Sequence, residues 1–198
     1  MSQNIKTDGT SRRSIGARQN PDTESAILDA ALDLLLTKGP KGLTMDAVAR
    51  KAKAGKATIY RWWPTRGALL LAIYGRIKGP HAHADTGQLE TDISAFFDHV
   101  FAFWQGDAGR VFAQIIAQAQ GDAEVAEALR QYRCDRIDDW LVVLKRADAR
   151  GELSNDIAPE QIAEVIIALA WQHLLIDRLD AKGADLARIV ASGILKGR

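Results

Sequence analysis

The feature that most constrains the fold of this chain is the stretch 43–63, in which two short helical patterns are separated by a break at 52–55. In the first pattern, Met45, Val48 and Ala49 recur at the spacing of three and four residues that places side chains on one face of a helix. The second pattern is barely two turns long, and an isolated helix of that length is only marginally stable in water. It must therefore be held in place by packing on its neighbours.

The second pattern, residues 56–63, has two sides of different character. Ile59 and Trp63 are four residues apart and share one side. Hydrogen-bond donors dominate the rest of its surface: Lys56, Thr58, Tyr60 and Arg61. Two short helices joined by a tight turn, the second displaying donors, are typical of a DNA-binding helix-turn-helix. The pattern alone also allows an ordinary helical hairpin whose polar side meets only water.

Four runs of residues follow one another between positions 22 and 75: Ile27–Ala31, Leu43–Ala49, Ala57–Trp63 and Arg66–Leu70. Their order and sequence resemble the DNA-binding domain of TetR/AcrR-type transcriptional regulators. The family pattern usually has Gly in the turn where this chain has Lys53, and often Ser or Thr at the helix cap where it has Gly55. A residue other than Gly that is forced to positive φ costs about 1–2 kcal/mol. The geometry of this turn is therefore where the chain departs from the family.

The charge of the chain is divided between its two parts. Residues 1–78 contain 14 Lys and Arg against 6 Asp and Glu, a balance of +8. Residues 79–198 contain 12 against 19, a balance of −7, so the net charge of +1 conceals the division. A basic half joined to an acidic half is expected when a nucleic-acid-binding module is attached to a module that does not bind nucleic acid.

Composition limits the class of protein and its compartment. The chain has 198 residues, 47% of them hydrophobic, which is enough for one large or two small globular domains. Cys134 is the only cysteine, so no disulfide can form within the chain. No apolar run approaches the ~20 residues that cross a bilayer, and the basic N-terminus lacks the apolar segment of a secretory signal. We therefore expect a soluble cytoplasmic protein without a membrane partner.

The chain is predicted to have three parts. Residues 1–20 are polar, carry Arg12, Arg13 and Arg18, and are expected to be a disordered basic arm. The arm is either a solubilising tail or a contact to DNA phosphates or the minor groove. Residues 21–78 form the helix-turn-helix DNA-binding domain with a fourth, linking helix. Residues 79–198 form a second helical domain, which begins at the Gly-Pro break.

The second domain is predicted to be helical throughout, because it shows the helical spacing of apolar residues and no alternation of the kind that strands have. The expected helices span 89–104, 110–120 after a break bracketed by Gly106 and Gly109, about 122–150, and 159 to about 179. A last helix, after a break at 182–183, carries the apolar residues from Leu186 to Leu195. The helix that starts at Pro159 is apolar on more than one face and must be covered on several sides. The predicted fold class is therefore all-α: three helices in the DNA-binding head, a linking helix and about five helices in the body.

The predicted DNA-binding residues lie in and around the second helix of the helix-turn-helix. They are Thr44, Lys53, Lys56, Ala57, Thr58, Tyr60, Arg61, Trp62 and Arg66. The exposed face of 56–62 is expected to contact bases in the major groove of double-stranded operator DNA. Thr44, Tyr60 and Arg66 are expected to position it on phosphates.

The resemblance implies that the body binds a small-molecule effector and forms a homodimer. Most of the aromatic residues lie in this half, and the predicted effector, of unknown identity, is apolar or aromatic. The candidate ligand-binding residues are Phe97, Phe101, Trp104, Trp140 and His173, with His99 as an alternative polar group. Ordinary core packing is the competing interpretation for each of these rings.

The last two helices are predicted to form the dimer by packing against their two-fold copies. The candidate interface residues are Ile162, Val165, Ile166, Leu169, Leu186, Ile189, Val190 and Ile194. The linking helix is the only one placed in contact with both halves. A ligand wedged among the rings is therefore expected to displace its C-terminal end and to pivot the head away from DNA.

The sequence offers little catalytic or metal chemistry. Asp138 and Asp139 are adjacent and therefore point to different parts of a helix surface, and the pair His81 and His83 lacks the further ligands that a metal needs. Cys134 is interpreted as a small buried residue, with a redox switch as the alternative.

We expect no cofactor, no metal ion and no enzymatic activity. A ligand-responsive homodimeric repressor is the favoured function; a non-specific architectural DNA-binding protein, or an enzyme or carrier that uses the aromatic cavity, are the alternatives.

Overall fold

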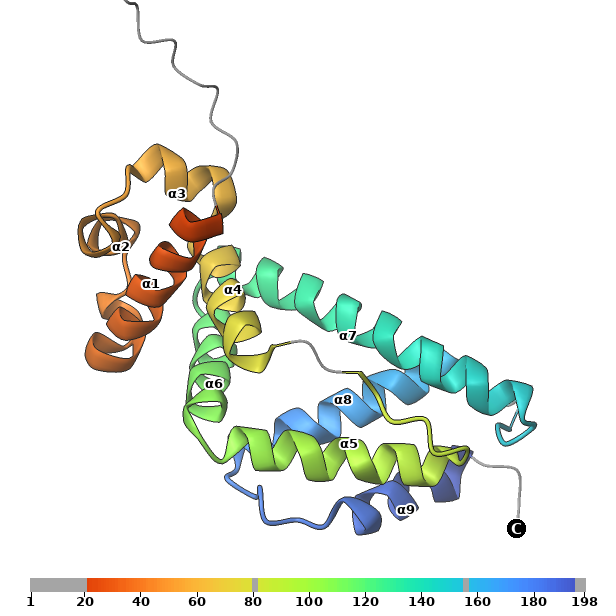
Figure 1. Cartoon of the computed structure of the whole chain (residues 1–198). Helices are drawn as coiled ribbons and strands as arrows, with labels where there is room; N and C mark the ends of the chain where they lie inside the picture. Colours follow the sequence, from red (N-terminus) through yellow and green to blue (C-terminus); the bar gives the residue numbers. More distant parts are fainter. Residues whose placement is uncertain (1–20, 80–81, 155–156, 195–198) are drawn as a thin grey trace, which may run out of the picture.

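The computed structural model describes residues 21–79, 82–154 and 157–194, with only the backbone of Ile194. Over these residues the chain forms nine α-helices, arranged as a small head above a larger body (Figure 1). The helices are α1 (Pro21–Gly42), α2 (Met45–Ala52), α3 (Lys56–Trp62), α4 (Arg66–Lys78), α5 (Leu89–Trp104), α6 (Asp107–Ala119), α7 (Ala123–Ala149), α8 (Pro159–Leu175) and α9 (Gly183–Ile194). The all-α fold class predicted from the sequence is confirmed. The basic arm predicted at 1–20 lies outside the described residues.

The head consists of α1, α2 and α3 around a small apolar core. Ile59 is fully buried and Trp63 is nearly so, which confirms that these two residues hold the short α3 against its neighbours. Ile27, Leu35 and Val48 are buried with them in the same hydrophobic cluster. The helical geometry of α1 is interrupted at Gly39, which has φ 66° and precedes Pro40. The two parts of α1 are therefore joined by a kink at Gly39.

The turn between α2 and α3 is built on Lys53. The hydroxyl of Thr44 accepts a hydrogen bond from the backbone N–H of Ala47 at 3.1 Å and so caps the N-terminus of α2. After α2, Lys53 adopts φ 51° and ψ 36°, the left-handed conformation. This is the position where the family pattern usually has Gly, and the chain turns there at the steric cost that a side chain imposes.

The linking helix α4 packs against α1 in the head and against α6 and α7 in the body. Thr65 caps its N-terminus by accepting a hydrogen bond from the N–H of Ala68 at 3.1 Å. Gly67 lies so close to the start of α7 that an added Cβ would be 2.6 Å from the carbonyl oxygen of Glu124. The head is therefore seated directly on the body. The prediction that α4 alone contacts both halves is wrong, because α1 also packs on α6.

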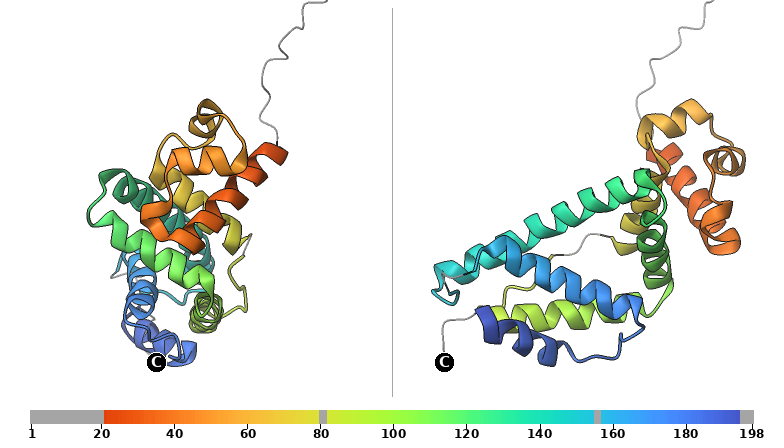
Figure 2. Two further views of the ribbon diagram at one scale, coloured as in Figure 1. Left: turned by 90° about the vertical axis from the view of Figure 1, so that its left-hand side faces the viewer. Right: turned by 180° about the vertical axis from the view of Figure 1, so that it is seen from behind.

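The body is a bundle in which α7 runs from the junction with the head to the far end of the molecule (Figure 1). Helix α8 packs on α7 and α5, and α6 connects this layer to the head through α4 and α1. Helix α9 lies along the outer side of α5, as both views in Figure 2 show. The contacts with α7 and α5 cover much of the apolar surface of α8.

Two helix boundaries differ from the prediction for physical reasons. Gly109 was expected to break the chain, but it lies inside α6, where an added Cβ would clash with the backbone carbonyl of Trp104. Its role is close packing of two helix ends, which a sequence pattern cannot distinguish from a break. Helix α8 ends at Leu175 rather than near Leu179, and Asp177 follows with φ 55°.

Candidate DNA-binding surface and effector cavity

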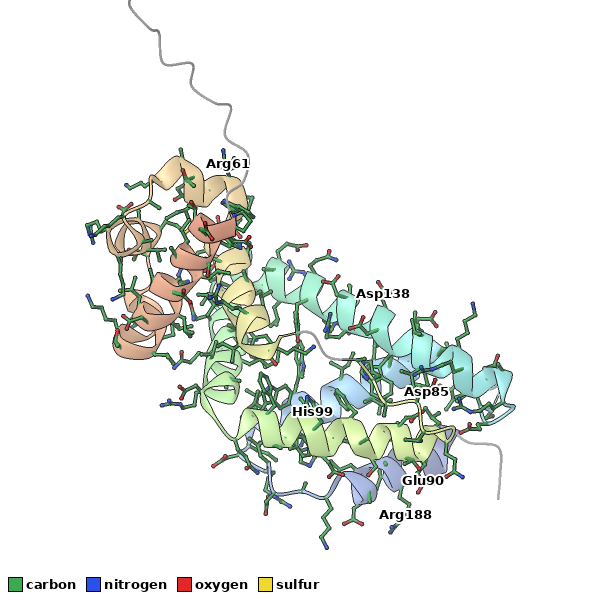
Figure 3. The ribbon with its side chains drawn as sticks, in the orientation of Figure 1. Arg61, Asp85, Glu90, His99, Asp138 and Arg188 are labelled. Carbon is green, nitrogen blue, oxygen red and sulfur yellow. The ribbon has the colours of Figure 1, made fainter. Side chains whose placement is uncertain are left out.

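The outer surface of α3 presents side chains that can donate hydrogen bonds. Lys56, Ala57, Tyr60 and Arg61 are exposed there, while Thr58 is half-buried. Arg61 lies at the outer tip of the head, on the side away from the body (Figure 3). A short helix with an exposed donor-rich face at the tip of a domain has the shape and chemistry to enter a major groove.

Two further predicted residues flank this surface. Thr44 and Lys53 are both exposed, at the start and the end of α2. The ammonium of Lys56 forms an ion pair with Asp46 across the two helices. Both partners are more than half exposed, so the pair is weak and the ammonium can exchange Asp46 for a phosphate or a base.

Trp62 departs from the predicted DNA-binding set. Its ring is half-buried, packs on the core of the head and stacks on Trp63 with the ring centroids 5.9 Å apart. The indole Nε1 is buried as well. Trp62 therefore supports the position of α3 rather than presenting a donor to solvent.

Arg66, predicted as a phosphate contact, is directed to the junction between head and body. Its Nε donates to the carbonyl of Leu43 at 3.0 Å, and Nη2 donates to the carbonyl of Pro40 at 2.7 Å. Nη1 forms an ion pair with Asp122 at 3.2 Å, and Nη2 also donates to Gln118. We therefore correct this assignment: the guanidinium is used within the protein, where it joins α1, α6 and α7.

The body contains an aromatic cavity of about 50 Å³ between α4, α5, α7 and α8. Its lining consists mainly of rings together with a few charged groups. The lining residues are Tyr74, Lys78, His83, Phe96, His99, Val100, Phe103, Trp104, Tyr132, Arg136, Asp139, Trp140, Ile167, Ala170 and Trp171. His99, one of the two predicted polar groups, lies on α5 near the middle of the body (Figure 3).

The cavity includes only part of the predicted ligand-binding set. Trp104 and Trp140 line it. Phe97 and Phe101 do not, because they are buried in the core of the body. His173 stacks on Phe101 with the ring centroids 5.4 Å apart and lies outside the lining. Phe97 and Phe101 are therefore packed in the core of the body, and His173 is half-buried beside Phe101.

Apart from Trp140, the groups that α4 and α7 contribute to the cavity were not predicted from the sequence. Tyr132, Arg136, Asp139 and Trp140 are spaced at i, i+4, i+7 and i+8, which places them on one face of α7. This spacing was visible in the sequence, but it does not reveal which helix that face meets. The partner is the C-terminal half of α4, through Tyr74 and Lys78.

Hydrogen bonds and stacking fix the inner wall of the cavity. Trp104 Nε1 donates to the hydroxyl of Tyr74 at 2.9 Å, and Tyr74 is in turn hydrogen-bonded to Tyr132. Phe112 stacks on Tyr74 with the ring centroids 4.4 Å apart. Burial, which disfavours the phenolate, raises the pKa of Tyr74 and of Tyr132 above their usual range. Both hydroxyls therefore remain neutral at physiological pH.

The other residues singled out in the sequence form no reactive site in the described part of the chain. Cys134 is exposed rather than buried, and Asp138 lies on the outer side of α7 (Figure 3). The ring of His83 packs on Trp140 at 4.6 Å, and His81 lies outside the described residues. No three His, Cys, Asp or Glu side chains gather there closely enough to hold a metal ion. None of the described helices is both long and apolar enough to span a membrane.

The predicted dimer residues divide into two groups. Ile162, Ile166, Leu186 and Val190 are buried within the single chain, so they belong to its own core and are corrected. Val165 and Ile189 are 55% and 65% exposed, respectively, and Leu169 is half-buried. The side chain of Ile194 is outside the described part of the chain.

A helix-turn-helix head with an exposed donor-rich helix, seated on a helical body with an aromatic cavity, defines the class of the protein as a helical DNA-binding transcriptional regulator. Residues 27–73 match the family model described as bacterial regulatory proteins of the tetR family. Residues 83–192 match the model described as the tetracyclin repressor-like C-terminal domain. The chain belongs to the TetR family.

Similar proteins agree with this assignment over most of the chain. The HTH-type transcriptional regulator YdeS of Bacillus subtilis is 31% identical over 167 residues, which cover 81% of this chain and 82% of YdeS. The DNA-binding transcriptional repressor TetR of Mycobacteroides abscessus is 28% identical over 155 residues, covering 77% and 82%.

Solved structures with the same fold include Salmonella enterica GusR, with a TM-score of 0.66 and 20% identity over 89% of this chain and 96% of GusR. A structure of the SmeT–triclosan complex has a TM-score of 0.62 and 18% identity over 88% of this chain and 92% of SmeT. At these identities the similarity establishes the fold alone.

Proposed function

We propose that the protein is a homodimeric repressor that binds a specific operator and releases it when a small molecule enters the body cavity. The observation that carries this proposal is the placement of α4. Its N-terminal residues Arg66 and Gly67 lie at the junction with the head, and Tyr74 and Lys78 near its C-terminus line the cavity. One rigid helix thus touches both the DNA-binding part and the cavity.

The DNA-reading surface is proposed to be Lys53, Lys56, Ala57, Thr58, Tyr60 and Arg61, with Thr44 on a phosphate. Arg61 and Lys56 carry positive charge toward the groove and are assigned to base edges. Tyr60 offers a single hydroxyl and is assigned to the phosphate backbone. Arg66 and Trp62 are excluded from this surface because the protein itself engages them.

The dimer is proposed to form through the exposed sides of α8 and α9. The apolar residues left uncovered on these helices and just after α8 include Val165, Leu175, Ile176 and Ile189, all more than half exposed. Two helices from each copy would form a four-helix interface. The two heads would then contact half-sites one helical turn, or a multiple of it, apart.

The release step is proposed to begin at the cavity. Its 50 Å³ is smaller than the ~150 Å³ of an engineered cavity that binds benzene, so an aromatic ligand must push side chains aside. Tyr74 and Lys78 are among the groups that would move. That movement would shift α4 and, through Gly67 and Arg66, the head. SmeT, a protein of the same fold, has been solved in complex with triclosan, so this fold accommodates small molecules.

Binding to DNA that flanks the protein's own gene tests the proposal. The wild type should prefer one sequence over unrelated duplexes of equal length at fixed salt. Arg61→Ala and Lys56→Ala should each weaken specific binding by about 1–3 kcal/mol if the residue contacts a base edge. Tyr60→Phe should weaken binding to all duplexes alike. Arg130→Ala, which removes an exposed charge from α7, is the control and should change neither.

The alternatives give different results in the same assay. A non-specific architectural protein would bind all duplexes equally. An enzyme or carrier would bind or convert small molecules without measurable DNA affinity. An unchanged affinity of Arg61→Ala for the preferred sequence would contradict the assignment of α3 as the recognition helix.

A further inference from the structure

The cavity in the body carries an excess of positive charge. Its only carboxylate is Asp139, whereas both Lys78 and Arg136 line it. Asp139 Oδ2 is ion-paired with Arg136 Nη2 at 3.1 Å. Lys78 takes part in none of the ion pairs that join the described residues of the chain. One positive charge in this cavity therefore lacks a close negative partner.

The surroundings of Lys78 are unfavourable for a cation. The pKa of its ammonium is lowered to about 8, chiefly by burial and also by the nearby positive charge of Arg136, while Asp139 acts in the opposite direction. At neutral pH the ammonium is still mostly protonated. A partly desolvated charge is stabilised when a group of opposite charge approaches it.

Arg136 presents a second unsatisfied group. Its Nε is buried and has no hydrogen-bond acceptor within the described part of the chain. Its guanidinium carbon lies 5.1 Å from the centre of the Tyr132 ring, so the ring holds the planar group in place. Buried donors are nearly always hydrogen-bonded in folded proteins, and an orphaned one marks a position where an acceptor fits.

The two tyrosine hydroxyls of the cavity are already used by the protein. The hydroxyl of Tyr74 accepts from Trp104 and is hydrogen-bonded to Tyr132. The rest of the lining is dominated by rings, with Phe96, Phe103 and Trp171 among them. The imidazoles of His83 and His99 also line the cavity. A ligand therefore meets flat apolar walls, these two imidazole rings and the cationic groups of Lys78 and Arg136.

We propose that the effector is a flat aromatic molecule with one anionic group, such as a carboxylate, which the ammonium of Lys78 and Nε of Arg136 hold while the rings enclose the apolar part. The inference rests on the proposed function in one respect: it takes this cavity as the effector site. An anion there would supply the acceptor that Arg136 Nε lacks and the charge that Lys78 lacks. Because Lys78 is the last residue of α4, the anion would also bind directly to the helix that seats the head.

Matched pairs of acids and amides test the charge of the ligand. Benzoate, cinnamate and 2-naphthoate are compared with benzamide, cinnamamide and 2-naphthamide, which have the same rings and no charge. Affinities are measured with the full-length protein by calorimetry and by quenching of tryptophan fluorescence, since Trp104, Trp140 and Trp171 line the cavity. The acid of at least one pair should bind about tenfold or more tightly than its amide, as expected for charge-assisted hydrogen bonds.

Two variants assign that preference to Lys78. Lys78→Met should fold, because it keeps the length of the side chain and removes a poorly solvated charge. This variant should lose the preference for the acid and should bind the amide as the wild type does. Lys145→Met removes an exposed lysine from α7 outside the cavity and should keep the preference. A preference that survives in Lys78→Met would overturn the role of Lys78.

The remaining outcomes separate the inference from the proposed function. Amides that bind as tightly as acids in every pair would overturn the anionic class and leave the cavity intact as an effector site. Binding of neither series at about 1 mM would overturn the inference as well. Acids that bind through Lys78 but leave operator affinity unchanged would support the ligand class and contradict the proposed release mechanism.

Discussion

At the scale of single residues, Arg66 is the clearest case in which chemistry suited to DNA serves the fold instead. Its side chain is 24% exposed, and its guanidinium is surrounded by two backbone carbonyls, Asp122 and Gln118. Arginine suits this position because its fixed fork of donors can satisfy several acceptors at once, which lysine cannot. From the sequence, an Arg next to a helix-turn-helix could not be distinguished from a phosphate contact.

The salt dependence of DNA binding tests this reassignment. Arg66→Gln should leave the slope of log affinity against log salt unchanged, because the residue neutralises no phosphate. It should instead lower the free energy of unfolding by about 1–3 kcal/mol, the cost of buried acceptors left without a donor. Lys53→Gln is the comparison and should reduce the slope by about 0.9 if its ammonium contacts a phosphate. An equal reduction in Arg66→Gln would restore Arg66 to the DNA-binding surface.

At the scale of helices, the packing of α4 on α7 depends on a glycine. An added Cβ at Gly67 would lie 2.6 Å from Glu124 O and 2.9 Å from the Cα of Val125, both backbone atoms that cannot rotate away. The helices would have to separate. Gly75 lies in the same helix, is exposed and has no atom within 4 Å of the position of such a Cβ. The two positions therefore form a matched pair.

Gly67→Ala should lower the free energy of unfolding by about 1–3 kcal/mol through overpacking. Gly75→Ala should raise it by about 0.5–1 kcal/mol, because Ala is the better helix former. Chemical denaturation of both variants measures the two effects. We also expect Gly67→Ala to change operator affinity although the residue lies outside α3, and Gly75→Ala to leave it unaltered. Equal stability of the two variants would show that the α4–α7 contact is loose.

The helices were predictable from the sequence to the extent that local signals define them. The spacing of apolar residues located all nine helices of the described chain. The cavity was only half predictable, because its lining comes from helices far apart in the sequence. Periodicity shows that Phe97 faces inward, but whether it meets another ring or a cavity depends on the partner helix. Tyr74, Lys78 and Arg136 were missed for the same reason.

At the scale of the whole molecule, the uncovered apolar residues at α8 and α9 predict how two copies associate. Val165→Glu would place a charge in the proposed interface next to its two-fold copy. It should raise the dimer dissociation constant about 100-fold or more, because an unpaired buried charge costs several kcal/mol. Val142→Glu, at an equally exposed valine of α7, should leave the dimer intact. Sedimentation at micromolar concentration distinguishes the two, and a wild-type monomer there would contradict the interface.

The same scale governs how effector and operator influence each other. If a ligand in the cavity shifts α4 and the heads lose their half-site spacing, the ligand must bind the DNA-free arrangement more tightly. Coupling free energies of this kind are typically ~1–3 kcal/mol, or about 5–150-fold in affinity. Because the coupling is reciprocal, operator DNA must weaken ligand binding by the same factor.

The experiment that tests this coupling titrates the tightest-binding carboxylate of the series into the protein with and without operator, at one salt concentration. We expect weaker binding in the presence of operator, and expect unrelated DNA at the same concentration to have a smaller effect. Equal ligand affinities with and without operator would rule out this coupling, even if the ligand occupies the cavity.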